Sequence, residues 1–372
     1  MSPERDGFAA LRERLEQRFA EGVKSAWSDS EFNECALAVF DFQYEANAAY
    51  RGLARGRGLR AGELSSWREV PAVPTRAFKR LSLVSGEEDD VERIFRTSGT
   101  TGGQGERGSH HVRSLALYRA AALPTLRAHL LPEGGRIRIL SLVPPADLQP
   151  ESSLAAMVGF ALESFGAAGS AYFTDPDQGQ DHRGFDEAVA RAVSDREPVL
   201  VVGTAFAFVH WLDAAGPNAR GSVLPEGSRV METGGFKGRS REVARTDLYR
   251  ALAARLGIDA ARIVNEYGMT ELLSQFYEPV LHEGGETGRR LVGPPWVRTR
   301  VLDPETLEES PEGTVGLLCH LDLANVGSVA AVLTEDLGKR VGDGFVLSGR
   351  SAGAEPRGCS LVMEEIMRAT TR

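Results

Sequence analysis

A loop rich in glycine and hydroxyl side chains spans residues 97–103 and is the first candidate for chemistry. It consists of Thr97, Ser98, Gly99, Thr100, Thr101, Gly102 and Gly103. Glycine tolerates positive φ and lets backbone N–H groups approach an anion, and Ser and Thr add side-chain donors. The stretch therefore predicts a phosphate-binding loop, with the cation Arg107 in reach of the same charge. Taken alone, it also fits an ordinary flexible Gly/Ser loop.

Two common nucleotide motifs do not fit this region. Residues 103–108 formally spell GxGxxG, but no acidic residue follows about twenty positions later to hold a ribose, and the segment is far from the first βαβ pattern. No Gly-Lys-Ser/Thr ends the loop, so the Walker A pattern is absent as well. The loop thus indicates phosphate binding of another type.

A second constellation occupies residues 265–271, with the sequence Asn-Glu-Tyr-Gly-Met-Thr-Glu. It follows an expected strand over 262–265, and we expect a helix to open at Leu272. Strand ends that feed helix starts bind anions in α/β sheets. Thr270 can donate to phosphate, Glu271 can hold Mg²⁺, and Tyr267 can stack on a base. A plain helix N-cap at Thr270 and Glu271 is the alternative.

A third constellation lies near the C-terminus. Residues 334–336 read Thr-Glu-Asp, and Gly349-Arg350 follows after Asp343-Gly344. Asp336 could accept hydrogen bonds from ribose hydroxyls, and Arg350 could face phosphate or ribose. Because Asp-Gly is a common hairpin signal, two turns of an antiparallel subdomain explain the same residues.

Helices and strands must hold these candidate site residues in place, and the sequence predicts that helices and strands alternate along the chain. We expect helices over 114–130, 154–165, 185–193, 206–214 and 241–256, and strands over 136–143, 171–174, 198–203, 229–233 and 262–265. Such alternation predicts an α/β fold with largely parallel sheets covered by helices. From residue 291, short strands over 296–302, 313–321, 328–333 and 344–347 predict a small antiparallel β subdomain. We therefore expect a large domain over 1–290 and a small β subdomain over 291–372.

The first 95 residues are predicted to be a helical lead and a connector within the large domain. Phe8, Leu11, Leu15 and Phe19 recur at helical spacing among charged residues, which predicts an amphipathic helix. The block from Trp67 to Thr75 contains prolines that forbid a helix and favour extended chain. We expect that block to run across a surface.

The amino-acid composition limits the kinds of binding partner and the cellular location that we expect. The net charge of -9 disfavours non-specific nucleic-acid binding, because no basic excess is available to displace counterions. No apolar run is long enough for a membrane span or a signal peptide, so we expect a cytoplasmic protein. The three cysteines, Cys35, Cys319 and Cys359, have no metal-site or disulfide spacing. Any special cysteine is therefore expected to act alone.

The three constellations together, in this order, resemble the adenylate-forming superfamily of acyl-CoA synthetases, adenylation domains and firefly luciferase. Residues 97–103 resemble its phosphate loop, 267–271 its Tyr-Gly-x-Thr-Glu motif, and 334–336 its Thr-Gly-Asp motif with Glu335 in place of Gly. By the same resemblance Arg350 falls on the hinge, and Gly234 and Gly235 line the adenine pocket. The implied nucleotide site contains Thr97, Ser98, Gly99, Thr100, Thr101, Gly102, Arg107, Gly234, Gly235, Glu266, Tyr267, Gly268, Asp336 and Arg350, with Thr270 and Glu271 catalytic and Glu271 on the metal.

Two departures point to one branch of that superfamily. The loop lacks the usual Pro-Lys-Gly and offers Arg107, and the residues after Arg350 are too few for the mobile lid domain that brings a catalytic lysine. The chain resembles the acyl-protein synthetases of the bacterial bioluminescence fatty-acid reductase complex, which lack that domain. In that family a cysteine near the C-terminus accepts the acyl group, and Cys359 lies at the matching place. The neighbouring Arg357 guanidinium would favour its thiolate, and Gly358 would let the tail bend.

The resemblance implies a two-step reaction with ATP and Mg²⁺. A carboxylic acid, fatty or related, would form an acyl-adenylate, and Cys359 would then accept the acyl group for a protein partner such as a reductase or carrier. The same motifs fit a coenzyme A ligase of the phenylacetate type, or a non-catalytic ATP-binding scaffold.

Residues for the acyl chain are less defined. Segments 154–165 and 206–211 supply apolar side chains, although the default expectation for most of them is a place in the core. His110 and His111 follow the loop and could face substrate, but a surface turn is the simpler expectation.

Overall fold

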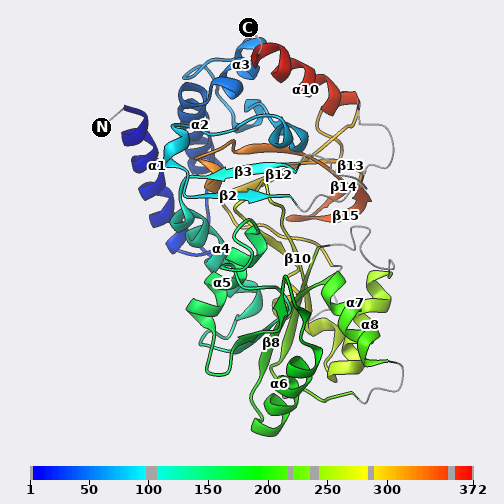
Figure 1. Cartoon of the computed structure of the whole chain (residues 1–372). Helices are drawn as coiled ribbons and strands as arrows, with labels where there is room; N and C mark the ends of the chain where they lie inside the picture. Colours follow the sequence, from blue (N-terminus) through cyan, green and yellow to red (C-terminus); the bar gives the residue numbers. More distant parts are fainter. Residues whose placement is uncertain are drawn as a thin grey trace. The chain divides into compact units, whose positions relative to one another are not determined.

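The computed structural model describes residues 3–97, 107–216, 221–234, 243–283, 289–350 and 357–370. Its contacts divide the chain into two compact units. Unit 1 contains Met1–Thr125, Met269–Gln275 and Val292–Arg372, and unit 2 contains Leu126–Gly268 and Phe276–Leu291. Figure 1 shows the elements of both units, coloured along the sequence.

Unit 2 is built on a six-stranded sheet of order β11-β10-β9-β8-β4-β5. The neighbouring pairs from β5 to β10 are parallel, and β11 alone is antiparallel. The strands are β4 (Arg138–Ser141), β5 (Ala171–Tyr172), β8 (Val199–Thr204), β9 (Arg229–Thr233), β10 (Ile263–Tyr267) and β11 (Phe276–Tyr277). The run Val-Leu-Val-Val of β8 is buried throughout, as expected for a strand covered on both faces.

Three helices of unit 2 pack on one face of this sheet: α6 (His182–Asp195), α7 (Ala205–Ala215) and α8 (Arg245–Leu256). Their buried side chains form one core with those of β4, β8 and β9, and it includes Phe185, Trp211 and Leu252. The helix α8 ends at Gly257, whose φ of 62° is the left-handed value that glycine adopts at little cost. Also in this unit are α5 (Ser153–Phe165), the short helices η4 (Ala260–Arg262) and α9 (Val280–Glu283), and the hairpin of β6 (Thr174–Asp175) and β7 (Gly179–Gln180).

Unit 1 contains a mostly antiparallel sheet from the C-terminal third of the chain. Its strands are β12 (Val297–Leu302), β13 (Gly316–Asp322), β14 (Ala331–Val341) and β15 (Gly344–Arg350), and β1 (Val73–Pro74) joins β14 in parallel. The helix η5 (Leu323–Asn325) follows β13 directly. Residues 73–74 therefore form a strand of a sheet whose other strands lie more than 200 residues later in the sequence.

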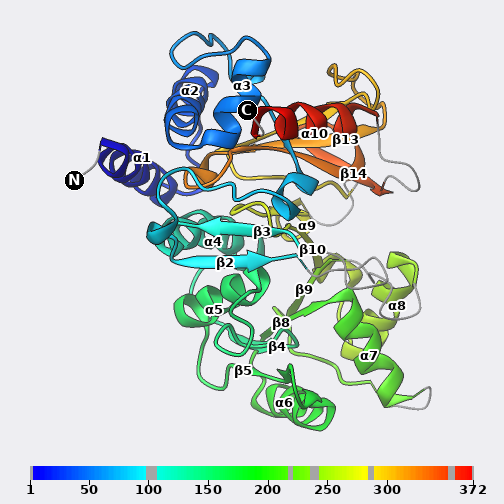
Figure 2. The same ribbon diagram turned by 45° about the horizontal axis from the view of Figure 1, so that its top comes forward.

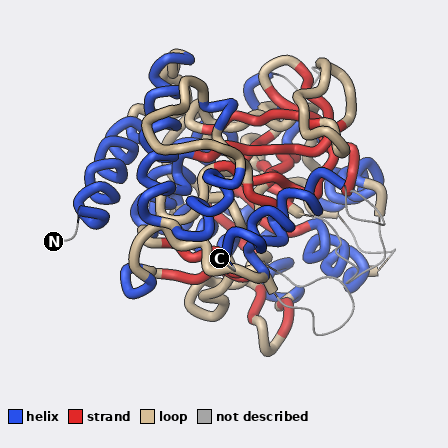
Figure 3. The backbone as a smooth tube through the Cα atoms, turned by 90° about the horizontal axis from the view of Figure 1, so that it is seen from above, coloured by secondary structure: helices blue, strands red, loops and turns tan. Residues whose placement is uncertain are grey.

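Helices of both termini belong to unit 1. Helices α1 (Pro3–Ala20), α2 (Asp29–Ala46) and α3 (Ala48–Gly56) lie side by side at the N-terminal end (Figure 3). The helix α2 starts with a capping box, in which Ser28 and Glu31 satisfy each other's backbone N–H groups. The C-terminal helix α10 (Arg357–Thr370) packs against α3 and β1 (Figure 2).

A two-stranded ribbon carries the glycine-rich loop. It pairs β2 (Arg93–Arg96) with β3 (Ser109–Val112) in antiparallel register, and α4 (Leu115–Leu130) follows it. The boundary between the two units falls within α4. The short helices η1 (Trp67–Glu69), η2 (Thr75–Lys79) and η3 (Glu88–Asp90) precede the ribbon.

The structure confirms the predicted α/β class, with a parallel sheet covered by helices and a separate antiparallel sheet. It differs in the grouping of residues, because the first 125 residues belong with the C-terminal sheet rather than with the parallel one. The block from Trp67 to Thr75 is not a surface segment: Trp67, Val70 and Val73 are buried, and residues 73–74 are a strand. Pro74 fits the edge of a sheet, whereas the start of the block, before its first proline, forms the short helix η1 (Trp67–Glu69).

Candidate functional site

The two residues at the base of the glycine-rich loop, Thr97 and Gly108, are hydrogen-bonded to each other, and we call this pair the neck of the loop. Thr97 N donates to Gly108 O at 2.9 Å, and Gly108 N donates to the Thr97 hydroxyl at 2.8 Å. A Cβ on Gly108 would lie 3.1 Å from Thr97 Cγ2, so the two segments approach as closely as glycine allows. The predicted phosphate-binding residues Ser98, Gly99, Thr100, Thr101 and Gly102 lie outside the described residues. The structure thus shows how the loop is held at its base.

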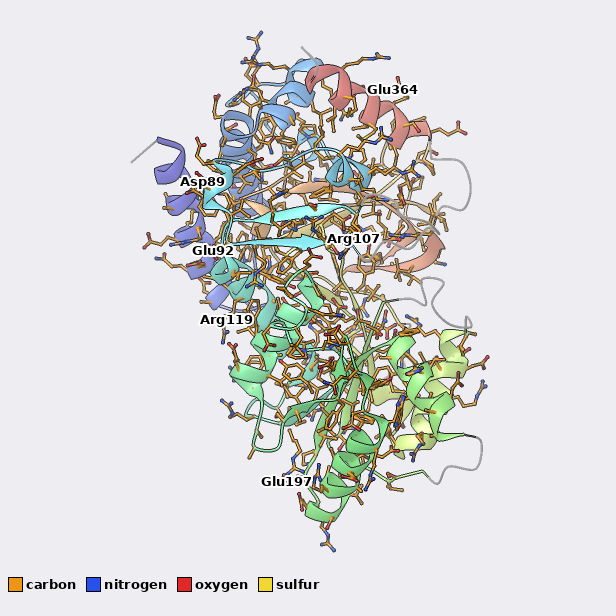
Figure 4. All side chains as sticks on the ribbon, viewed as in Figure 1. Asp89, Glu92, Arg107, Arg119, Glu197 and Glu364 are labelled. Carbon is orange, nitrogen blue, oxygen red and sulfur yellow. The ribbon has the colours of Figure 1, made fainter. Side chains whose placement is uncertain are left out.

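Arg107 lies at the same neck. Its Nε donates to Thr97 O at 2.7 Å, and a second guanidinium nitrogen lies 3.4 Å from Arg96 O. Figure 4 shows Arg107 at the loop end of the β2–β3 ribbon, opposite the end that carries Glu92.

The segment Met269–Gln275 carries Thr270 and Glu271 and belongs to unit 1. The expected helix at Leu272 is wrong: residues 269–275 form turns and bends, and β11 follows at Phe276. Asp322 holds this irregular segment: its carboxylate accepts from the backbone N–H groups of Leu273 and Ser274 at 2.9 and 2.8 Å. Thr270 is partly exposed and Glu271 is buried, and both are turn residues that do not begin a helix.

His110 was expected in a surface turn, and that expectation is wrong. It lies on β3, is 1% exposed, and packs edge-on against Phe78. Its Nδ1 lies 2.7 Å from Thr270 O, and because a carbonyl only accepts, Nδ1 carries the proton. Burial lowers the pKa of His110 to about 4, so the imidazole is neutral at pH 7.

In unit 2, the predicted nucleotide-binding residues lie at the carboxyl edge of the parallel sheet. Thr233 and Glu266 are direct neighbours on β9 and β10; Gly234 directly follows β9, and Tyr267 ends β10. Gly234 has a φ of 73°, which suits glycine. Ligands of open α/β sheets bind at this edge. Tyr267 is largely buried with its ring 5.8 Å from that of Phe276, Gly268 is exposed, and Gly235 lies outside the described residues.

The edge contains two buried carboxyls. Glu266 accepts a hydrogen bond from the Thr233 hydroxyl, and Glu232 accepts from the Tyr249 hydroxyl at 3.0 Å and from Asn265 Nδ2 at 2.8 Å. Burial raises the pKa of both glutamates to about 7. Sequence reasoning missed Glu232, although an acidic residue between Met231 and Thr233 in an apolar strand is a detectable signal.

The third constellation forms the pairing of β14 with β15. Asp336 and Arg350 are opposite each other in register, and Arg350 Nε donates to Asp336 Oδ1 at 2.9 Å. The Thr334 hydroxyl donates to Leu318 O and accepts from Asp336 N. Glu335, the departure from the superfamily motif, accepts from Arg76 Nε at 2.6 Å. The structure confirms a hairpin turn before Gly344, whereas residues 334–336 lie within β14 and not in a turn, and the nucleotide role of these residues stays a prediction.

Cys359 does not lie in a bending tail, which corrects the expectation from Gly358. It is in the first turn of α10, is 3% exposed, and packs with Leu302, Leu317 and Cys319. Burial raises the pKa of the neighbouring Cys319 thiol to about 11. The side chain of Arg357, expected to favour the thiolate, lies outside the described residues.

The described residues are compatible with a Mg²⁺ ion that is held by a single carboxylate together with substrate phosphates. Among the described residues, no group of three or more His, Cys, Asp or Glu side chains could hold a metal ion. Mg²⁺ commonly uses only one or two carboxylates together with substrate phosphates and water. A single carboxylate such as Glu271 is compatible with that mode.

The apolar segments proposed for an acyl chain are mainly core. Phe208 and Trp211 on α7 are buried in the centre of unit 2, and Met157 on α5 is buried as well. The default expectation for these segments was therefore correct for these residues. Within the described part of the chain, no helix is both long and apolar enough to cross a membrane.

Comparison with known proteins gives a family match over most of the chain. The sequence model of the family described as acyl-protein synthetase, LuxE, matches residues 24–368. The long-chain-fatty-acid–luciferin-component ligase of Aliivibrio fischeri is 25% identical over 310 residues, which cover 81% of this chain and 76% of the relative. The protein of the same name from Vibrio harveyi is 22% identical over 374 residues, covering 94% and 92%.

Solved structures of 2-hydroxyisobutyryl-CoA ligase share the fold. An open conformation of 2-hydroxyisobutyryl-CoA ligase, in complex with 2-HIB-AMP and CoA, superposes with a TM-score of 0.59 at 15% identity, covering 87% of this chain and 74% of that one. ATP-bound MatB from Rhodopseudomonas palustris gives a TM-score of 0.49 at 19% identity over 72% of this chain. The chain spans 49% of the MatB structure.

Proposed function

The chain belongs to the LuxE family of acyl-protein synthetases, and we propose that it activates a long-chain fatty acid with ATP and transfers the acyl group to a thiol. The observation that carries the proposal is the family match over residues 24–368, which includes the glycine-rich loop and the Tyr267–Glu271 motif. The two relatives named as long-chain-fatty-acid–luciferin-component ligases support the acid class.

The first step joins the acid to the nucleotide. A carboxylate oxygen attacks the α-phosphorus of ATP, and the bond from that phosphorus to the β-phosphate oxygen breaks, so that pyrophosphate leaves. The carboxylate is already ionised at neutral pH, so no general base is needed. Catalysis then consists mainly of stabilising charge on the phosphates.

Residues of unit 1 supply donors for that charge. We assign the phosphates to the loop with Ser98, Thr100 and Thr101, to Arg107 at its neck, and to the Thr270 hydroxyl. The closed neck at Thr97 and Gly108 supports this role, because it fixes where the loop begins and ends. Glu271 would hold Mg²⁺, which supplies positive charge to the phosphate oxygens.

The nucleoside is assigned to the remaining predicted residues. Tyr267, Gly234, Gly235, Glu266 and Gly268 would bind adenine, and the position of Gly234 directly after β9 and of Tyr267 at the end of β10 supports this. Asp336 would bind ribose hydroxyls, with Arg350 holding its carboxylate. A protonated Glu266 can donate as well as accept, which suits the edge of a base.

In the second step a thiolate attacks the acyl carbon, the bond to AMP oxygen breaks, and AMP leaves with the oxygen. We propose Cys359 as the acceptor, from which the acyl group would pass to a protein partner such as a reductase or carrier. Because Cys359 is buried in α10, this step requires that the helix leave its packed position. The same burial favours a second candidate, in which a free thiol such as coenzyme A accepts the group.

Intact-mass analysis separates these possibilities. The protein is incubated with ATP, Mg²⁺ and fatty acids of several lengths, alongside Cys359→Ala and the control Cys35→Ala. An acyl mass on the parent and on Cys35→Ala, absent from Cys359→Ala, is expected. Pyrophosphate release without an acyl mass, together with acyl-coenzyme A formation when coenzyme A is added, would favour the second candidate. No pyrophosphate with any acid would refute the activity.

A further inference from the structure

The segment Met269–Gln275 has no helix or strand of its own to satisfy its backbone. Buried carbonyl and N–H groups need partners, so an irregular segment that is partly buried must obtain them from elsewhere in the fold. Thr270 and Glu271, which carry the proposed phosphate and metal roles, lie in this segment. Their position therefore depends on the side chains that bind the segment's backbone.

Two side chains bind the two consecutive carbonyls. His110 Nδ1 donates to Thr270 O at 2.7 Å, and Asn325 Nδ2 donates to Glu271 O at 2.7 Å. Both side chains belong to residues that are fully or almost fully buried. Because both acceptors are carbonyls, only side chains that carry a hydrogen-bond donor can occupy these two places.

Both donors rest on well-supported elements of unit 1. His110 is on β3, the strand that continues directly from the neck of the glycine-rich loop, and it pairs in register with Phe95 of β2. Asn325 ends η5, and the buried Gln43 of α2 holds it there: Gln43 Nε2 donates to Asn325 O at 2.8 Å, and Gln43 Oε1 accepts from Ala330 N at 3.1 Å. The two donors thus connect the segment to the loop's ribbon and to the N-terminal helices.

We propose that His110 and Asn325 are positioning residues for adenylation, which hold the carbonyls of Thr270 and Glu271 so that the adjoining hydroxyl and carboxylate are presented to the triphosphate. This inference rests on the proposed function and names a part of its machinery. Preorganised donors act only when they are in place before the reaction, and a misplacement of about 1 Å can cost about a hundredfold in rate. His110 also couples the Thr270 carbonyl to the strand that carries the phosphate loop.

The test uses variants that remove a donor but keep the shape. His110→Phe keeps a ring against Phe78 and loses Nδ1–H, whereas His110→Asn keeps an N–H at nearly the same place. Asn325→Asp replaces the amide by an acceptor of equal size. Ser328→Ala is the matched control, because its buried hydroxyl donates to Leu83 O at 2.7 Å in the same unit without bonding to residues 269–275.

Two measurements are made on each folded variant. Hydrogen exchange of the peptide covering residues 269–275 is followed without substrate, and kcat and KM for ATP are measured by fatty-acid-dependent pyrophosphate release. We expect faster exchange and a kcat lower by about 10- to 100-fold in His110→Phe and Asn325→Asp, with KM changed much less. His110→Asn should recover most of the rate, and Ser328→Ala should keep the parental kcat.

Other results of these two measurements would overturn the proposed positioning role of His110 and Asn325 or the proposed function. Parental exchange or parental kcat in His110→Phe and Asn325→Asp would overturn the proposal, as would an equal loss in Ser328→Ala. If His110→Phe does not fold, Asn325→Asp provides the same comparison. A parent that releases no pyrophosphate refutes the proposed function, and exchange in residues 269–275 then decides alone whether these side chains hold the segment.

Discussion

Glu232 and Glu266 give the parallel sheet of unit 2 a charge that changes near neutral pH. They lie on neighbouring strands, and burial raises the pKa of each carboxyl to about 7 from about 4.5. Glu278 raises the pKa of Glu232 further, whereas Arg245 and the hydrogen bonds to Tyr249 and Asn265 lower it. At pH 5 both carboxyls are therefore mainly protonated in the folded protein.

The sign of the resulting pH dependence follows from proton counting. Between about pH 4.5 and 7 the folded protein binds more protons than the unfolded chain, so the stability contributed by these groups is complete below pH 4.5 and is lost as pH rises through 7. We expect Glu232→Gln to flatten this dependence by about 3 kcal/mol, measured as the free energy of urea unfolding from pH 5 to 8.5. Glu187→Gln, exposed on α6, is the control. A parental slope in Glu232→Gln would show that the carboxyl is ionised throughout.

The hydroxyls of the glycine-rich loop make a separate prediction. If Thr101 donates to the phosphates in the transition state, Thr101→Ala should lower kcat for pyrophosphate release by about 10- to 100-fold, because each such donor is typically worth a few kcal/mol. Thr314→Ala removes an exposed threonine hydroxyl elsewhere in unit 1 and should leave the rate unchanged. Equal rates in the two variants would remove Thr101 from this role.

At the scale of elements, α10 decides whether Cys359 can react. Cys359, Val362, Met363 and Ile366 are all buried, and their helical spacing places them on one face. The opposite face is exposed and includes Glu364, labelled in Figure 4. An ion pair of 2.8 Å between Arg57 and Glu365 joins α10 to the end of α3. The helix is therefore a packed element of unit 1.

This packing predicts slow labelling of Cys359 by a maleimide. Ile366→Ala removes a buried anchor without touching the thiol, and we expect it to speed labelling of the Cys359 peptide at least tenfold, because such truncations cost about 2–5 kcal/mol. Arg57→Ala removes only a partly exposed ion pair and should change the rate by no more than about fivefold. The buried Cys35 is the internal reference in peptide mapping. Equal acceleration at Cys35 would indicate general unfolding instead of release of α10.

For the whole molecule, nucleotide binding should appear as stability. A ligand that binds only the folded state at a hundred times its Kd adds about 2.7 kcal/mol, which for a chain of this length raises Tm by about 3 °C. We expect this rise with ATP and Mg²⁺, measured by calorimetry, and a smaller one in Thr101→Ala. An identical Tm with and without nucleotide, at concentrations up to several millimolar, would contradict ATP binding by the free protein.

Periodicity and motifs in the sequence predicted most of the regular elements. The strands at 198–203 and 229–233 and the helices at 154–165 and 206–214 agree with the structure to within a residue or two, because a continuous apolar strand or an amphipathic helix is a local pattern. The glycine-rich loop and the Tyr267–Glu271 motif could be recognised because each is a run of consecutive residues and is therefore also a local pattern. These local patterns were enough to predict the α/β class and to recognise the family.

The tertiary structure decided where the candidate site residues lie and what holds them. Residues 269–275 predicted a helix start at Leu272, but they form turns and bends, and Asp322, far along the chain, binds the backbone N–H groups of Leu273 and Ser274. His110 is 160 residues from Thr270, and no local pattern connects the two. Cys359 was expected in a tail that Gly358 lets bend, yet it lies in a helix and the sheet of residues 297–350 buries it. Such contacts depend on which distant residues meet, and that is settled only when the whole chain packs.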